Sequence, residues 1–525
     1  MRRFPATTRC LLLVMVSALV CAAAMSPAPP SPPPVTSDPT PPSTPIETPT
    51  PTPSVSPSLA PPPPTSAPTR FPTPPDPRPP RKTPPEACPN AGKFDFDGDG
   101  QDDAVVGDQF AGFGSSRGGR LFLLRGRAGA PLDPVIEAFE SGVPGWTARP
   151  GHIDGDRCMD LVVANPFADS SDALGSGMAY VFWGGRDFGR VGSPRLELRA
   201  PKPRAGARFG WSVAVRDHLI AMGAPYEDAD GETGSGAVYL FQVDKREPGR
   251  PKRITQESPG VPGASEAGDL FGWSVTIGRL GHDPDMPDLA VGAPFEDADD
   301  AGGDDAGAVT VLYDVSAREA PYEGAKWDLH QATDEVPATA GDRFGYSLRY
   351  GKNGVKSYLA VGAPLADPER VRDAGVVVLF EVAESGPRFL RVVRQGFTGI
   401  GEHLEQGDRF GASVAFSGPY LLVGIPGEGS PEAPESGAVG VVPLADGPPG
   451  WMQTEDDPRP YDHFGASVGP FGEGRFLIGA PDRGVTGAVT VVTTPISVGG
   501  RESNELSPTG AAGAEALDFG SFVTG

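Results

Sequence analysis

The stretch Arg208–Phe241 reads RFGWSVAVRDHLIAMGAPYEDADGETGSGAVYLF and contains the unit from which most of this chain is built. It holds a Phe-Gly pair with an alternating apolar run, a second apolar run ending in Gly-Ala-Pro, an acidic loop and a third alternating run. Apolar residues that alternate with period two between Gly and Pro are typical of short antiparallel strands. Pro225 has no N–H to donate, so it favours the point where a strand leaves its ladder. The stretch therefore predicts three strands joined as hairpins.

The same order of parts recurs downstream at intervals of roughly 55 to 75 residues. A weakly marked fourth strand, such as Leu196–Leu198, fits within this spacing, and four short strands per repeat are typical of a propeller blade. Two divergent copies precede Arg208, one around Gly145-Trp146 and one around Ala104–Gly107. The later copies begin at Phe271-Gly272, Phe344-Gly345, Phe410-Gly411 and Phe464-Gly465.

The first copy lacks its opening Phe-Gly strand, and the end of the chain supplies one. Joining Phe519–Gly525 to Lys93–Asp97 restores the missing run in register. A ring closed in this way leaves no open sheet edge for other chains to pair with. We therefore expect an all-β fold: a seven-bladed β-propeller of four-stranded antiparallel blades, closed by pairing of the C-terminal strand with the N-terminal blade.

Residues 1–24 have the pattern of a secretory signal peptide. Arg2, Arg3 and Arg9 precede or open an apolar stretch that ends near Ala22-Ala23-Ala24, an Ala-x-Ala cleavage site. The stretch is too short to favour a membrane span, so we expect a secreted, extracellular protein. Two alternatives remain open: lipidation of Cys21, which would anchor the N-terminus in the cell envelope, and a twin-arginine signal at Arg2-Arg3.

Residues 25–86 are rich in Pro, Ser and Thr and have almost no large apolar side chains. Such a segment cannot bury a core, and we expect a disordered linker. It is either a stalk that carries the propeller of residues 87–525 away from an attachment point, or a leader with no attachment.

The formal net charge is −24, and removal of the three arginines of the signal segment makes it about −27. This acidity excludes nucleic acid and anionic membrane surfaces as partners of the general surface, and it favours cations or a basic partner. Two cysteines remain after processing, Cys88 and Cys158. In an extracellular protein this pair predicts one disulfide, with two free thiols as the alternative.

The clearest chemical motif is Asp95-Phe-Asp97-Gly-Asp99-Gly-Gln101-Asp-Asp103. Alternate residues of a tight loop point the same way, so Asp95, Asp97 and Asp99 can converge on one cation, with the Gln101 carbonyl and Asp103 completing the set. Oxygen-only ligands of high negative charge select Ca²⁺ over zinc or copper. We predict a Ca²⁺ cofactor of structural role, the alternative being a solvated acidic hairpin.

The second copy carries a weaker version of this loop, His152-Ile-Asp154-Gly-Asp156-Arg-Cys158-Met-Asp160. Asp154, Asp156, the Cys158 carbonyl and Asp160 would be its ligands, whereas His and Arg157 replace an Asp and a Gly of the first loop. We expect weaker binding or none. The fourth copy, with Asp283, Asp285 and Asp288 interrupted by prolines, indicates a degenerate loop.

Acidic residues also gather in the loops between the second and third strands, which we expect to project from the opposite face of the ring. They either receive a basic partner or keep the loops soluble. They are Glu227, Asp228, Asp230, Glu232, Glu296, Asp297, Asp299, Asp300, Asp304, Asp305, Glu428, Glu432 and Glu435.

Signs of catalysis are few. Gly114-Ser-Ser116-Arg-Gly118 fits the GxSxG pattern, but it lies in a Gly-rich loop without a following helix, so it does not indicate a nucleophile elbow. We predict no catalytic residues.

The Phe-Gly, Gly-Ala-Pro and DxDGDGxxD motifs together resemble the FG-GAP repeats of the integrin alpha N-terminal propeller and of bacterial secreted relatives. The resemblance covers about residues 93–525. It implies calcium in the matching loops and ligand binding at the loop-rich face. No inserted domain, C-terminal leg or membrane span is apparent, so integrin-like signalling is not implied.

Two function classes follow. The favoured one is a monomeric, non-catalytic binding or adhesion module that takes a protein or glycan ligand. The alternative is an extracellular hydrolase with a site at the central channel, because a propeller fold does not settle function.

Overall fold

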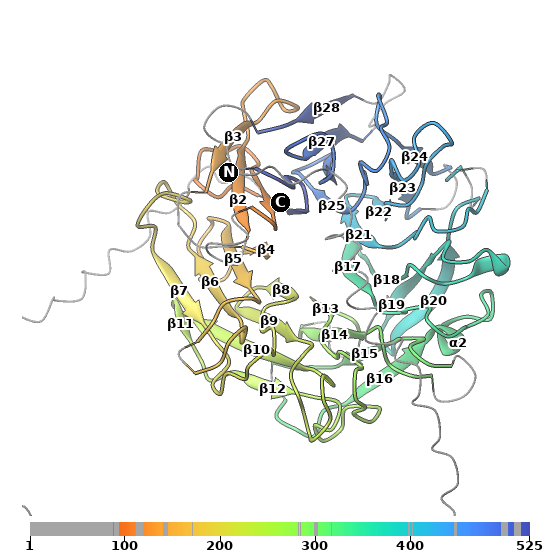
Figure 1. The fold of residues 1–525 in the computed structure, drawn as a ribbon. Helices are drawn as coiled ribbons and strands as arrows, with labels where there is room; N and C mark the ends of the chain where they lie inside the picture. The colour runs from red at the N-terminus through yellow and green to blue at the C-terminus, as the bar shows by residue number, and fades with distance from the viewer. Residues whose placement is uncertain are drawn as a thin grey trace, which may run out of the picture. The chain divides into compact units, whose positions relative to one another are not determined.

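The computed structural model describes Cys88 and residues 94–524 apart from 112–118, 140–144, 171, 282, 284, 299–302, 317, 397–398, 402, 446–448, 495–501 and 509–515. Seven antiparallel sheets form a ring around a central channel, which confirms the predicted seven-bladed propeller (Figure 1). The expected signal peptide and linker, Lys93, Gly525, Asp299, Asp300 and the Gly114–Gly118 motif lie outside the described residues.

In each blade the first strand named below lies nearest the channel and the last lies at the rim. In blades 2 to 7 this is also the order along the chain, whereas the inner strand of blade 1, β29, comes from the C-terminal end. Blade 1 contains β29 (Phe522–Thr524), β1 (Ala104–Asp108), β2 (Arg120–Arg125) and β3 (Val135–Ala138). Blade 2 contains β4 (Thr147–Gly151), β5 (Asp160–Asn165), β6 (Met178–Phe182) and β7 (Arg195–Leu198). Blade 3 contains β8 (Val213–Arg216), β9 (Leu219–Ala224), β10 (Ala237–Asp244), β11 (Glu247–Pro248) and β12 (Lys252–Ile254), both of the last two pairing with β10.

The remaining four blades follow in chain order. Blade 4 contains β13 (Ser274–Gly278), β14 (Asp288–Ala293), β15 (Ala308–Leu312) and β16 (Gly324–Asp328). Blade 5 contains β17 (Ser347–Asn353), β18 (Lys356–Ala363), β19 (Val376–Ala383) and β20 (Gly386–Val393). Blade 6 contains β21 (Ser413–Ser417), β22 (Tyr420–Ile425), β23 (Ala438–Pro443) and β24 (Trp451–Gln453), and blade 7 contains β25 (Ser467–Pro470), β26 (Arg475–Ala480), β27 (Ala488–Thr493) and β28 (Ser503–Leu506). Two short helical turns, α2 (Leu329–Ala332) and η1 (Pro368–Arg370), lie in connections.

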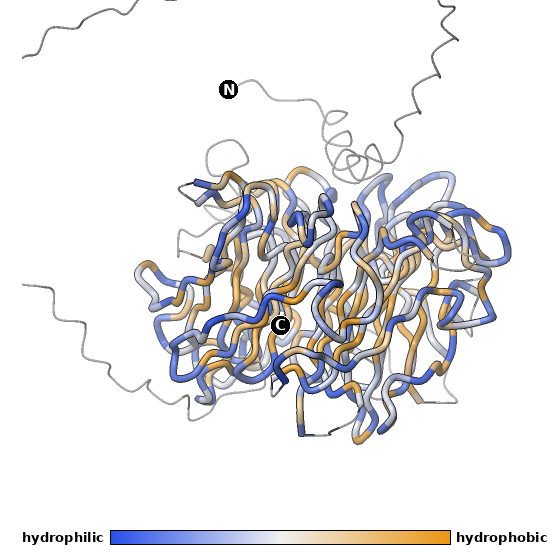
Figure 2. The backbone as a smooth tube through the Cα atoms, turned by 90° about the horizontal axis from the view of Figure 1, so that it is seen from below, coloured by the Kyte–Doolittle hydropathy of each residue, from blue (hydrophilic) through white to orange (hydrophobic). Residues whose placement is uncertain are grey.

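The core lies between neighbouring blades. The second and third strands are buried on both faces, so they read as nearly continuous apolar runs, whereas the rim strands are largely exposed. Figure 2 shows the same division, with apolar residues along the strands and hydrophilic residues in the loops. The phenylalanines of the Phe-Gly pairs fill the space between blades and are fully buried: Phe209, Phe271, Phe344, Phe410, Phe464 and Phe519.

A repeated polar contact explains why the motif residues have their identities. In blades 3 to 7 the serine two positions after the Phe-Gly pair donates its hydroxyl hydrogen to the glycine carbonyl of the next blade's pair, as in Ser212 Oγ to Gly272 O at 2.7 Å. A Cβ on the glycine of Gly-Ala-Pro would lie 1.9 Å from that same carbonyl in the case of Gly223. Only glycine permits so close an approach of two backbones. The other serines of this series are Ser274, Ser347, Ser413 and Ser467.

The ring closes as predicted, through the end of the chain. Strand β29 pairs antiparallel with β1, with Val106 opposite Val523. The bridge between Gly487 and Phe519 has the same parallel geometry as the bridges Gly177–Phe209, Gly236–Phe271 and Gly437–Phe464 between other neighbouring blades. The Asp108 carboxylate adds a further tie, because it accepts the Leu517 N–H at 2.6 Å. Blade 1 is therefore assembled from both ends of the described chain.

Candidate metal-binding loops and the two faces of the ring

The loop between the inner strand position and β1 brings three predicted ligands together. Carboxylate oxygens of Asp95, Asp97 and Asp99 all lie within 4.8 Å of one another. Asp95 is fixed by two backbone N–H groups, those of Gly98 and Gly100, which donate to its two oxygens at 2.7 Å each. Both glycines have positive φ, 82° and 89°, which explains why glycine follows the second and third aspartates. The sequence thus specifies a tight loop whose side chains converge.

Asp103, the fourth predicted carboxylate ligand, lies beside the group of three and makes backbone contacts of its own. It is fully buried, and its carboxylate accepts the Phe96 N–H at 3.1 Å and the Gly126 N–H at 3.0 Å. The pKa of Asp103 is raised to about 8. Burial is the largest cause, the Asp97 and Asp95 charges also raise the pKa, and the two hydrogen bonds lower it. Asp103 is therefore not in the converging group of three, and it joins the loop to the end of β2.

An arginine that the loop sequence does not contain also reaches this cluster. The Arg125 guanidinium, at the end of β2, pairs through Nη1 with Asp97 Oδ2 and through Nε with Glu137 at 2.7 Å. Burial raises the pKa of Asp97, Arg125 opposes this effect, and Asp99 adds to it. The carboxylates repel one another, so Arg125 offsets part of a charge that a divalent cation would neutralise more completely.

The donor set fits calcium. All converging groups are carboxylate oxygens, and no nitrogen or sulfur ligand lies in the group. Hard oxygen donors with several formal charges are the environment that Ca²⁺ prefers. Asp95, Asp97 and Asp99 would hold the ion, and the carbonyl of Gln101, whose N–H donates to Asp99 at 2.8 Å, remains the predicted backbone ligand.

In the second loop, an arginine side chain of the same protein lies beside the carboxylates that were predicted to bind a metal ion. Arg246, from the β10–β11 turn of blade 3, lies with Nη2 2.6 Å from Asp154 Oδ2 and 3.7 Å from Asp156 Oδ2. The Cys158 carbonyl, a predicted ligand, is 3.0 Å from Nδ1 of His152. A guanidinium already balances the two carboxylates, so a metal would have to displace it. We keep the expectation of weaker binding here.

A buried aspartate at the start of the second strand is common to three blades. Asp160 accepts the N–H groups of Ile153 and Gly184 at 2.8 and 2.9 Å, and Asp288 accepts those of Leu280 and Asp314 at 2.6 and 2.8 Å. Burial raises the pKa of Asp160 to about 7 and that of Asp288 to about 6. The last aspartate of the motif thus connects the loop to its blade through backbone hydrogen bonds in all three copies. This holds for Asp288 too, although its loop is degenerate.

The predicted disulfide forms, and it lies against both acidic loops. Cys88 and Cys158 are bonded, with a Cα–Cα distance of 5.4 Å. Cys158 belongs to the second loop, and Cys88 packs on the first, since its Sγ lies 2.7 Å from the place of a Cβ on Gly98. A backbone hydrogen bond from Met159 N–H to Asp95 O, at 3.0 Å, joins the loops directly. The two loops therefore form one cross-linked unit on what we call the metal face of the ring, which also carries the C-terminal ends of the inner strands.

The acidic loops between second and third strands lie on the opposite face, which we call the loop face (residues 225–236, 294–307 and 426–437). Their acids do not all project into solvent as expected. Glu227 is 1% exposed and binds Arg253 Nε and the Tyr239 hydroxyl, each at 2.8 Å, and Glu296 is 4% exposed and pairs with Lys326. These two glutamates anchor the loops to the neighbouring strands. The loop sequences did not predict this role, because the partners of both glutamates lie outside the loops.

An arc of aromatic rings on the loop face escaped the sequence analysis. Trp211 lies between Trp146 and Trp273, with ring centroids 5.6 and 5.0 Å apart, and Tyr346 continues the arc at 5.5 Å from Trp273. Each ring directly follows a Phe-Gly pair or its equivalent, so it stands at the start of an inner strand. A signal was present, because aromatic residues recur at this position in four consecutive copies. A second row, from the acidic loops or their equivalent, packs behind the arc: Phe167, Tyr226 and Phe295.

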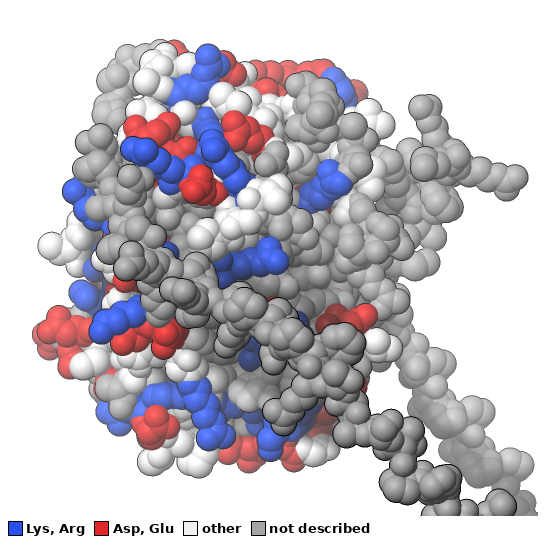
Figure 3. Space-filling view, turned by 90° about the vertical axis from the view of Figure 1, so that its left-hand side faces the viewer, with Lys and Arg blue, Asp and Glu red and all other residues white. Residues whose placement is uncertain are grey.

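The side of the ring has a mixed surface. Figure 3 shows Lys and Arg interspersed with Asp and Glu over the visible described residues. In the described part of the chain, no helix has the length and apolar character needed to cross a membrane.

Sequence comparisons with known proteins find FG-GAP repeats and proteins similar to part of this chain. A family model, the FG-GAP repeat, matches residues 196–241. Phosphatidylinositol-glycan-specific phospholipase D of Bos taurus is 27% identical over 239 residues, 42% of this chain and 26% of that protein. Integrin alpha-PS5 of Drosophila melanogaster is 28% identical over 165 residues, 29% of this chain and 15% of that protein. This chain thus spans about a quarter or less of the length of these relatives.

Among solved structures, the periplasmic gluconolactonase of Pseudomonas aeruginosa is 14% identical, with a TM-score of 0.43, and the match covers 79% of this chain and 97% of that chain. The repeat match, the integrin relative and the seven-bladed ring together support an FG-GAP β-propeller.

Proposed function

We propose that this protein is a secreted or surface-displayed, calcium-binding propeller that acts as a non-catalytic binding module, taking its ligand at the loop face. The observation that carries the proposal is the aromatic arc, in which Trp211, Trp273 and Tyr346 are partly exposed and the buried Trp146 supports them, with acidic loops beside it. Aromatic side chains with large contact areas are enriched among the residues that dominate binding energies.

The chemistry of this face favours a basic protein ligand over a neutral glycan. Tryptophan and tyrosine rings attract cationic side chains through their π faces. The acidic loops add a complementary potential, which speeds encounter and excludes acidic competitors. A neutral glycan would stack on the same rings without using the acidic residues. Raising the salt concentration should therefore weaken the binding of a basic protein and leave the binding of a glycan unchanged.

Calcium would act from the opposite face. Bound by Asp95, Asp97 and Asp99, it would neutralise repelling carboxylates and hold the first loop in one conformation, so that its binding free energy adds to folding stability. Blade 1 carries this loop and also the ring closure, so the metal would support the scaffold and would not contact the ligand.

The alternative function, a hydrolase with a site at the channel, is suggested by the name of the phospholipase relatives, of which this chain spans about a quarter. The pocket lining in the channel includes Thr276 and Tyr350 but, among the described residues, no carboxylate, histidine or cysteine. Carboxylates, histidine and cysteine are the groups that hydrolases use most often as general acids, general bases or nucleophiles. This composition supports the non-catalytic function.

The experiment is a binding survey with the purified calcium-loaded protein on arrays of basic peptides and of polysaccharides. We expect capture of basic peptides that weakens as salt is raised, and loss of capture in Trp211→Ala. Phe389→Ala, which removes an aromatic ring exposed by 41% on the rim of blade 5, is the matched control and should bind as the wild type does. Equal binding by Trp211→Ala, or turnover of ester, glycan or phosphoester substrates that one channel substitution abolishes, would overturn the proposal.

A further inference from the structure

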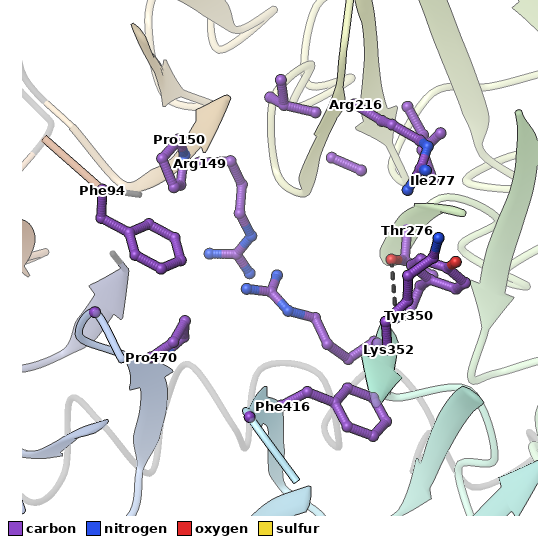
Figure 4. A pocket seen from close by; sticks show the side chains of 16 residues that line it. Phe94, Arg149, Pro150, Arg216, Thr276, Ile277, Tyr350, Lys352, Phe416 and Pro470 are labelled. Atoms are coloured by element: carbon purple, nitrogen blue, oxygen red, sulfur yellow. Dashed lines mark hydrogen bonds between the residues drawn. The ribbon is translucent and has the colours of Figure 1, made fainter. Parts of the chain in front are cut away.

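The central channel contains a pocket on the metal face, remote from the aromatic arc. It has a volume of about 350 Å³, and its walls are mostly the C-terminal ends of the inner strands of blades 2 to 7. Four basic residues line it, Arg149, Arg216, Arg349 and Lys352, and no Asp or Glu does so among the described residues. In Figure 4 the Arg149 side chain extends from β4 into the pocket, between Phe94 on one side and the wall that carries Phe416 on the other.

Two of these arginines, Arg149 and Arg349, repel each other, and neither has an acidic partner among the residues that the structure describes. The pKa of Arg149 falls to about 9, first because of desolvation and then because of the Arg349 charge, and desolvation lowers that of Arg349 as well. Arg149 donates from Nη1 to the Ala148 carbonyl at 3.0 Å, whereas its buried Nε has no acceptor among the described residues. Guanidinium groups buried together are unfavourable unless a negative charge lies between them.

This arrangement contrasts with the buried arginines elsewhere in the ring. Arg483 is bound by Glu455, Asp462 and Glu505, at 2.8, 2.6 and 2.8 Å. Arg343 pairs with Asp305 at 3.0 Å. In a chain with a formal net charge of −24, carboxylates are plentiful, so their absence from the channel lining is a specific feature of this site.

We infer that the channel pocket binds a small oxyanion, of which phosphate or a phosphomonoester group is the class that fits, between Arg149 and Arg349. Guanidinium groups recognise tetrahedral oxyanions with paired N–H donors, and two of them can neutralise a doubly charged ion. Pockets of this volume hold small ligands. A phosphate group occupies only part of the space, so an attached small group can enter with it.

Other lining residues suit this ligand. The Thr276 hydroxyl oxygen accepts the Tyr350 N–H at 3.1 Å, the contact drawn as a dashed line in Figure 4, so its hydrogen can be donated to an anion. Lys352 adds an exposed positive charge to the lining. Arg216 contributes less, because its guanidinium stacks over Tyr350 at 5.4 Å and its Nε is 3.8 Å from Asp217. Phe94, Phe416 and Pro470 form apolar walls that limit access of water.

The test uses the full chain in buffer without added calcium, titrated with inorganic phosphate and with glycerol phosphate, and with chloride at equal ionic strength. Phosphate at about ten times its Kd should raise the melting temperature by about 2 °C, and chloride should not. Binding of both phosphates indicates that an esterified group enters, and binding of inorganic phosphate alone indicates a site for the free ion. Either result supports the inference.

Substitutions locate the site. Arg149→Gln and Arg349→Gln should each reduce phosphate affinity at least tenfold, while melting in phosphate-free buffer stays equal or rises because repulsion is relieved. Arg388→Gln, an exposed arginine on the outer strand β20, removes the same charge and should bind as the wild type does. Line broadening of the phosphate signal in phosphorus NMR measures binding independently of stability. Equal effects of chloride and phosphate, or unchanged broadening in both channel variants, would overturn the inference.

Discussion

The hydroxyl group of Ser467 in blade 7 donates a 2.8 Å hydrogen bond to the carbonyl oxygen of Gly520, 53 residues further along the chain. Gly520 belongs to the segment that completes blade 1, so this bond is the last member of the series of serine hydrogen bonds that links blades 3 to 7 in order and blade 7 to blade 1. A Cβ on Gly479 would lie 2.0 Å from the same carbonyl oxygen. The Phe-Gly and Gly-Ala-Pro motifs are thus two sides of one contact between blades.

The first prediction concerns this contact. Ser467→Ala should lower the free energy of unfolding by about 1 kcal/mol, the usual net contribution of one hydrogen bond. Gly479→Ala should lower it by about 2 to 3 kcal/mol, because the methyl group must push two backbones apart. Urea unfolding measures both. Gly484→Ala is the control for the added methyl group alone: Gly484 has a positive φ, 67°, which Gly479 does not have, but a Cβ there meets no atom within 4 Å, so a loss of only about 1 kcal/mol is expected.

The second prediction concerns calcium. A chelator should lower the melting temperature of the wild-type protein, because the metal binds only the folded loop. Asp97→Ala should melt at the same temperature with and without chelator. Asp133→Asn, which removes an exposed carboxylate of blade 1 that pairs with Arg127 at 2.8 Å, should retain the response. An identical melting curve of the wild type with and without chelator would contradict the predicted site.

The third prediction concerns the disulfide. Replacing both Cys88 and Cys158 by alanine should reduce the free energy of unfolding by about 4 kcal/mol in the chain-entropy model, given the separation of 70 residues. Because Cys88 packs on Gly98, calcium affinity should also fall several-fold. Calorimetric titration with calcium measures this effect, and wild-type protein treated with a reducing agent should behave like the double variant. Unaltered affinity would show that the bond does not hold the first loop.

The fourth prediction concerns pH. Burial raises the pKa of Glu428 from 4.5 to about 7, and Asp408 and Glu405 raise it as well. Between those two values the folded protein holds a proton that the unfolded chain has released, so stability falls as pH rises through this window. Glu428→Gln should flatten the decline by about 1 to 2 kcal/mol between pH 5 and 8. Glu432→Gln, at an exposed position of the same loop, should leave it unchanged.

The sequence predicted the ring because the motifs that close it are local and repeated. A buried phenylalanine, a glycine at each close approach and the alternation of apolar residues all lie within one repeat, and Phe519-Gly520 carries the same pair. The convergence of Asp95, Asp97 and Asp99 was predictable for the same reason, since their spacing alone decides it.

The partners of these residues were not predictable, because they come from other strands. Arg125 reaches Asp97 across the hairpin of blade 1, and Arg246 reaches Asp154 from a turn 92 residues away. Glu227 looked like a surface charge until Arg253 and Tyr239 were placed beside it. Arg149 and Arg349 meet only because the inner strands of blades 2 and 5 both face the channel, which their sequences do not reveal.

Closure by β29 also has a consequence for how the protein is made. Strand β1 leaves the ribosome more than four hundred residues before its partner Phe522–Thr524. Until that partner arrives, one edge of blade 1 is a template for pairing with any extended segment nearby. The nascent chain therefore passes through a long interval in which misassembly competes with maturation, and a chaperone that shields that edge would improve the yield of native molecules.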